Sequence, residues 1–157
     1  MSEKLKVLLD KIGLDNKYYL PFEHGKISKL LIDKENKTWN FVIKLDKTLD
    51  IKTLKNFESL LRPSFEDLKD VYVTYEYEEL DIDKLNEYYQ YILEQLNLSK
   101  MFANNNYVIE NNTFTINVIN KMEFNKLDKV KEKIEIMLKR YGFAYEVKIN
   151  IDNESRK

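Results

Sequence analysis

The first half of the chain shows two periodicities of hydrophobic residues, one typical of helices and one of strands. Aliphatic residues recur at helical spacing over residues 5–12, and Gly13 is placed to end that helix. Residues 26–33 and 38–45 then predict two strands, the second with residues alternating at period two, joined by a polar hairpin loop. Asp50 can cap a helix that Pro63 should end near Leu61. Alternating Val71, Val73, Tyr75 and Tyr77 complete the half as a strand.

The second half repeats this order. Asp83 is placed to cap a helix over residues 85–96, and the turn Asn111-Asn112 should join two strands at 107–110 and 114–118. One long helix is predicted from Leu127 to Tyr141, ended by Gly142 and Phe143, and a last strand runs over residues 145–151.

The repeated order predicts an α+β fold made of two consecutive small α-β-β-α-β domains. Each domain should contain a three-stranded sheet covered on one face by helices, with the last strand parallel to a hairpin strand. The boundary is expected within the acidic segment 76–83, which gives domains at residues 1–79 and 80–157.

Composition and charge exclude several classes of function. The 157 residues carry 26 Lys and Arg against 27 Asp and Glu, a formal net charge of -1, and each half is close to neutral. That balance argues against a general nucleic-acid binder. The chain has no cysteine and a single histidine, His24, so thiolate zinc sites and catalysis based on cysteine or paired histidines are excluded. We therefore expect no catalytic residues, no metal site and no cofactor.

The opening residues contain charges throughout and no long apolar run, so they predict neither a signal peptide nor a membrane span. Together with the lack of cysteine, this favours a soluble cytoplasmic protein with no membrane partner.

The remaining candidates for binding are basic and aromatic residues. The long helix near the C-terminus is locally basic, and acidic neighbours offset much of that charge. Two tyrosines lie off the apolar faces of their elements and could stack on bases. The candidate binding residues are Lys126, Lys129, Lys133, Arg140, Tyr72 and Tyr91.

The α-β-β-α-β order also resembles the second type of KH domain, which grips a nucleic-acid backbone with a GxxG loop. Gly13, Gly25 and Gly142 are the only glycines, and none forms that motif. A KH-like second domain without GxxG is better interpreted as a protein-contact scaffold, and single-stranded nucleic-acid binding is kept as the alternative.

Particular sequence motifs indicate a relative. The run Lys34-Glu35-Asn36-Lys37-Thr38-Trp39-Asn40-Phe41-Val42-Ile43 resembles the extreme N-terminus of the PolC-type DNA polymerase III alpha chain of Gram-positive bacteria. In the second half, Leu98-Ser99, the hairpin end Val118-Ile119-Asn120, the run Phe124-Asn125-Lys126-Leu127 and Gly142-Phe143 look like the corresponding stretch of that family. Pro63 departs from the pattern, because a helix is expected there.

The resemblance implies a non-catalytic head of a replicative polymerase. In that family, two small N-terminal domains precede the polymerase and the 3'-5' proofreading exonuclease, whose residues would lie beyond Lys157. The first domain is similar to the C-terminal domain of the clamp-loader tau subunit and to the first domain of the initiator DnaA, and the second is thought to be KH-like. The expected partners are therefore the tau subunit or another replisome protein, with single-stranded DNA as the second choice.

Overall fold

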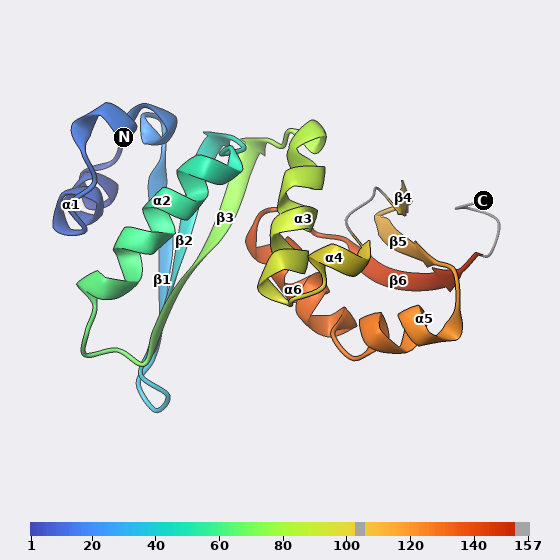
Figure 1. The fold of residues 1–157 in the computed structure, drawn as a ribbon. Helices are drawn as coiled ribbons and strands as arrows, with labels where there is room; N and C mark the ends of the chain where they lie inside the picture. The colour runs from blue at the N-terminus through green and yellow to red at the C-terminus, as the bar shows by residue number, and fades with distance from the viewer. Residues whose placement is uncertain (103–105, 153–157) are drawn as a thin grey trace. The chain divides into compact units, whose positions relative to one another are not determined.

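A computed structural model describes residues 1–102 and 106–152, and the chain divides into two compact units, Met1–Lys84 and Leu85–Lys157. Each unit is a mixed α+β structure with one three-stranded sheet, in the strand orders β1-β2-β3 and β4-β5-β6. Helices cover these sheets, as the sequence predicted (Figure 1).

The first unit contains the following elements in chain order: α1 (Glu3–Lys11), the 3-10 turns η1 (Asn16–Tyr18) and η2 (Leu20–Phe22), β1 (Lys26–Asp33), β2 (Thr38–Lys47), α2 (Ile51–Leu61), the 3-10 turn η3 (Arg62–Ser64), β3 (Asp70–Glu79) and the 3-10 turn η4 (Ile82–Lys84). The boundary predicted after residue 79 would place η4 in the second domain. In the structure, η4 belongs to the first unit.

The middle strand β2 is paired on both sides. It runs antiparallel to β1 through the hairpin and parallel to β3, with Trp39 opposite Val71 and Phe41 opposite Val73. Because a parallel pair cannot be joined by a tight turn, α2 makes the crossover connection.

One face of this sheet is covered and the other is open. Phe41, Ile43 and Leu45 on β2 are buried on the face that the helices cover. On the other face Asn40 and Lys44 are partly exposed, although Val42 between them is buried. The same alternation holds on β3, so the helices lie on one face of the sheet.

Local sequence signals set the helix ends in the first unit. Asp50 caps α2 by accepting a 2.8 Å hydrogen bond from the Thr53 amide, which lowers the pKa of Asp50, and Pro63 lies just beyond the helix in η3. Gly13 ends α1 with φ +77° while the Leu14 amide donates back to the Leu9 carbonyl, the bonding of a Schellman cap. These predicted ends are confirmed.

The second unit contains, in chain order, α3 (Leu85–Gln95), α4 (Ser99–Phe102), β4 (Tyr107–Glu110), β5 (Thr113–Val118), α5 (Lys121–Asp128), α6 (Lys131–Arg140) and β6 (Glu146–Ile151). Both residues of the Asn111-Asn112 turn have positive φ, as the predicted tight hairpin requires. β5 again lies in the middle, antiparallel to β4 and parallel to β6.

The prediction of one long helix from Leu127 to Tyr141 is wrong in one respect. The helix is divided into α5 and α6 at Lys129 and Val130, and Val130 has a non-helical φ of -116° and ψ of 7°. Both helices contact β6, and a strand of six residues spans only about 20 Å. An unbroken helix over both segments would be about 30 Å long, so the bend lets both pack on the short strand.

Two tyrosines of α3 form much of the second core. Tyr88 and Tyr89 are fully buried, and the Tyr89 ring lies 5.1 Å from that of Phe114 on β5. The Tyr89 hydroxyl donates to the Asn106 side-chain oxygen at 3.1 Å, which satisfies this buried polar group. The assignment of these tyrosines to the core is confirmed.

A test of packing in the first unit uses Gly25. A Cβ there would lie 2.5 Å from Leu45 Cδ2 and 2.9 Å from Leu5 Cδ2. We expect Gly25→Ala to lower the free energy of unfolding by about 1–3 kcal/mol, because overpacking displaces these side chains. Urea denaturation followed by circular dichroism measures the loss.

The matched comparison is a double-mutant cycle with Leu45→Val, which removes the atom nearest to the added methyl. The double variant should lose less stability than the sum of the two single variants. Strictly additive losses would show that contact with Leu45 is not the cause.

Candidate functional site

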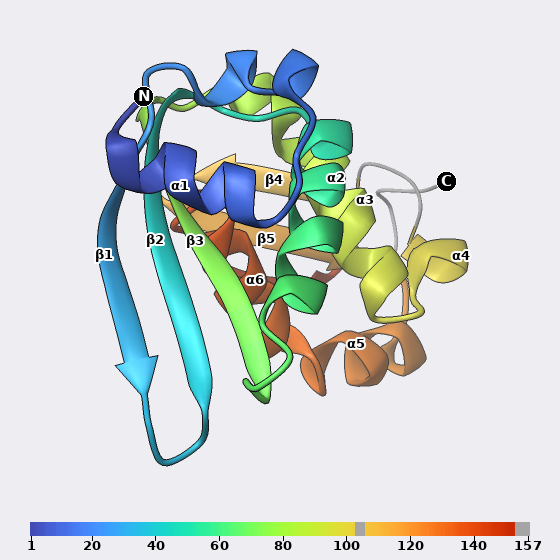
Figure 2. The ribbon, with the colours of Figure 1, turned by 90° about the vertical axis from the view of Figure 1, so that its left-hand side faces the viewer.

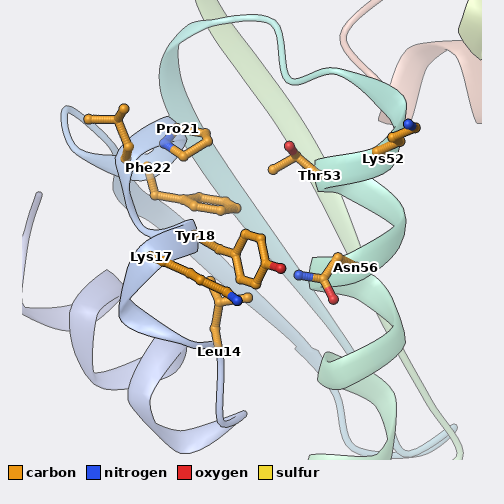
Figure 3. A pocket seen from close by; sticks show the side chains of 9 residues that line it. Leu14, Lys17, Tyr18, Pro21, Phe22, Lys52, Thr53 and Asn56 are labelled. Atoms are coloured by element: carbon orange, nitrogen blue, oxygen red, sulfur yellow. The ribbon is translucent and has the colours of Figure 1, made fainter.

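An apolar hollow of the first unit lies between the connector, which comprises residues 14–22, and the first half of α2. This hollow, the connector hollow, has a volume of about 480 Å³. Its lining consists of Leu14, Lys17, Tyr18, Leu20, Pro21, Phe22, Lys52, Thr53 and Asn56 (Figure 3).

The connector places large apolar groups around this hollow. Leu14 and Phe22 are buried at its base, while Tyr18 is 46% exposed and Leu20 is 74% exposed. Figure 3 shows the Tyr18 ring extending from the connector toward Asn56 on α2. Exposed apolar groups beside a buried apolar base can accept an apolar side chain from a partner.

The charged side chains that line the connector hollow are both basic. Lys17 and Lys52 are both exposed and line it, and no acidic residue does so. The Lys17 ammonium lies 5.1 Å from the centre of the Tyr18 ring, a cation–π contact that orients both side chains. A ligand with an apolar side chain next to a carboxylate matches this combination.

Two side-chain contacts hold the connector in place. The Tyr19 hydroxyl donates to an Asp10 carboxylate oxygen, which joins the connector to α1. On the other side, the Phe22 ring lies 5.2 Å from the Phe57 ring of α2. The hydrogen bond to Asp10, together with burial and the negative charge of Asp10 and Asp15, raises the pKa of Tyr19 to about 12.

A second hollow, of about 400 Å³, lies beyond Leu20 and Pro21 and includes the exposed His24 with Asp46 and Asp50. Asp50 is already engaged as the cap of α2. Within residues 1–102 and 106–152, no three histidine or acidic side chains are grouped so that they could hold a metal ion.

The structure brings together only some of the binding residues predicted from the sequence. Lys129 and Lys133, both exposed, line a hollow of about 480 Å³ at the turn between α5 and α6, together with Lys131, Asp128 and Glu132. Lys126 is exposed one turn earlier on α5, whereas Arg140 is half-buried at the far end of α6.

The two tyrosine candidates are less exposed than expected. Tyr72 on β3 and Tyr91 on α3 are both half-buried, and the Tyr91 ring lies 6.1 Å from that of Tyr141. They belong to different units. The binding roles of all six candidate residues stay predictions.

The connector hollow was missed by the sequence analysis. Five of its nine lining residues lie in two 3-10 turns of three residues each, which are too short to show any periodicity, and three more lie on α2. The only available signal was the unusual density of apolar residues around Pro21 in a segment without a strand or helix pattern.

Comparison with known proteins gives two matches. Residues 4–75 match the family model described as DNA polymerase III polC-type N-terminus I. The chain is similar to the N-terminal region of PolC-type DNA polymerase III. A PolC-type DNA polymerase III of Oceanobacillus iheyensis is 29% identical over 104 residues, which cover 64% of this chain. The resemblance inferred from the sequence is confirmed.

The extent of the PolC match limits what it implies. The 104 matched residues exceed the length of either unit, so the similarity extends into both. They span only 7% of the length of the Oceanobacillus PolC chain. No solved structure matches the chain. Across the described part of the chain, no helix has the length and apolar character needed to cross a membrane.

The link between Tyr19 and Asp10 makes a testable contribution to stability. The folded-state pKa of Tyr19, about 12, exceeds the ordinary value of 10.0, so folding favours the protonated phenol. The stabilisation should be present below about pH 10 and be lost as the pH rises toward 12. Tyr19→Phe should cost about 0.5 kcal/mol or less at pH 8, because the hydrogen bond that it removes is exposed to solvent.

Urea denaturation of both proteins at several pH values measures this difference. It should shrink steadily between pH 10 and 12, while Tyr18→Phe controls for general alkaline effects. A difference that does not change with pH would contradict the assigned cause.

Proposed function

We propose that this chain is a non-catalytic docking region at the N-terminus of a PolC-type replicative polymerase and recruits other replisome proteins in the cytoplasm. The parent chain would perform DNA-templated synthesis with 3'-5' proofreading, and this region would need no cofactor. The similarity to PolC supports the polymerase assignment. The connector hollow is the observation that supports docking.

The chemistry of the connector hollow suits a peptide rather than a reacting substrate. It offers an apolar surface, two ammonium groups and the amide of Asn56, but no carboxylate, histidine or nucleophile suited to acid–base chemistry. A protein segment with an acidic residue next to a large apolar residue would satisfy both parts. The clamp-loader tau subunit is the first partner to examine.

Calorimetry with the full chain and the C-terminal region of the tau subunit tests this proposal. We expect a dissociation constant well below 1 mM. Leu20→Ser should weaken binding about tenfold or more, since it removes an exposed apolar contact without opening the core.

The matched control is Val7→Ser, which removes an apolar residue that is 64% exposed on α1 and does not line the hollow. It should bind tau as the unsubstituted chain does. Absence of binding, or equal binding by Leu20→Ser, would reject docking through the connector hollow.

A second candidate function rests on the turn between α5 and α6. In a KH-like domain, the loop between two helices contacts a nucleic-acid backbone. Here Lys129, Lys131 and Lys133 surround a hollow at that turn, although no glycine allows close approach and two acidic residues share the site. These lysines could bind single-stranded DNA weakly through phosphate contacts.

Fluorescence anisotropy with a labelled oligothymidine tests the DNA-binding alternative. Three phosphate contacts predict a slope of about -2 for the logarithm of the association constant against that of salt concentration. The double variant Lys129→Glu/Lys133→Glu should abolish binding at low salt. Lys4→Glu/Lys6→Glu, with the same change of net charge on the exposed face of α1, should retain it. No anisotropy change at low salt would eliminate the alternative.

A further inference from the structure

The edge strand β1 exposes an unusual row of apolar side chains. Among the described residues it pairs only with β2, and Figure 2 shows it as the outermost strand of its sheet. Leu30, Leu31 and Ile32 are 38%, 53% and 50% exposed. An unpaired edge with exposed apolar residues is a template for pairing with another strand.

The register with β2 assigns each of these residues to a face. Leu30 lies opposite Phe41 and Ile32 opposite Trp39, so both share the face covered by helices. Leu31 and its neighbours at positions 29 and 33 lie on the open face. The register shift of β1 lies between Ile27 and Lys29, which leaves residues 29–33 as a regular strand.

This regular segment is complementary to itself. If two copies pair antiparallel about a two-fold axis perpendicular to the sheet at Leu31, Leu31 meets its own symmetry mate. Leu30 then lies opposite Ile32 on the covered face, and Lys29 lies opposite Asp33 on the open face. Each exposed apolar residue meets an apolar partner, and each charge meets its opposite.

We propose that two copies of this chain associate through β1 in this register and join their sheets into one six-stranded sheet. Leu31 is the central contact, and the pairs between Lys29 and Asp33 fix the register from both sides.

The charge pattern favours a second copy over an unrelated strand. A register slipped by one residue would place covered-face residues opposite open-face residues and would separate Lys29 from Asp33. Asp33 is exposed and accepts hydrogen bonds from the Asn36 side chain at 2.8 Å and from the Asn36 backbone amide at 3.1 Å, and both lower its pKa. Like any aspartate with an ordinary or lowered pKa, it is charged at neutral pH.

The dimer should be weak. Stable interfaces bury roughly 1,200–2,000 Å² of surface. A pairing segment of only five residues buries less surface than that. We expect a dissociation constant of roughly 10 µM to 1 mM. β1 shares no residue with the connector hollow, so this inference does not depend on the proposed docking function.

Sedimentation equilibrium of the full chain tests the proposal over a range of concentrations. The unsubstituted chain should show a reversible monomer–dimer equilibrium. Leu31→Glu and Leu31→Lys should each be monomeric, because either change places like charges opposite each other at the two-fold axis. An equimolar mixture of the two variants should dimerise again, because Glu then meets Lys at position 31.

The control is Val7→Glu, which introduces a charge at an exposed apolar position of α1 and should leave dimerisation unchanged. Circular dichroism checks that each variant is folded; Leu31 is exposed, so each should be. A monomeric unsubstituted chain at about 1 mM, dimers formed by either single Leu31 variant, or a mixture that stays monomeric would each overturn the proposed pairing.

Discussion

The parallel pairing of the middle strand with the last strand determines the arrangement of both units. β2 and β5 each accept a hairpin partner on one side and the final strand on the other. Because the parallel partner can be reached only by a crossover, α2 or the pair α5 and α6 must pass over the sheet. The crossover helices cover the face on which Phe41 and Phe114 point inward. In the first unit this leaves β1 at the edge of the sheet.

The sequence predicted several features that depend on local chemistry, although Asp83, which was expected to cap α3, lies inside the 3-10 turn η4. Asp50, Gly13 and the Asn111-Asn112 turn act on neighbouring backbone groups, and each works as expected. The break between α5 and α6 has no local cause: Val130 is neither proline nor glycine, and the bend arises from packing two helix segments on a short strand. The order of the elements was therefore easier to predict than the break within the crossover of the second unit.

The edge strand β1 and the connector hollow both include exposed apolar residues. The sequence pattern could not show that these residues are exposed. The run Leu30-Leu31-Ile32 has the composition of a fully buried strand, yet its place at the edge leaves all three residues exposed. The connector hollow combines residues from two short turns with residues of α2, which only the fold brings together.

The only tryptophan of the chain, Trp39, gives the first unit an optical signal of its own. It is half-buried on β2, with its ring 5.5 Å from that of Phe65 and opposite Ile32 of the edge strand. The second unit contains tyrosines but no tryptophan. Emission excited beyond the tyrosine absorption band therefore reports on the first unit alone, and its comparison with circular dichroism separates the unfolding of the two units without any label.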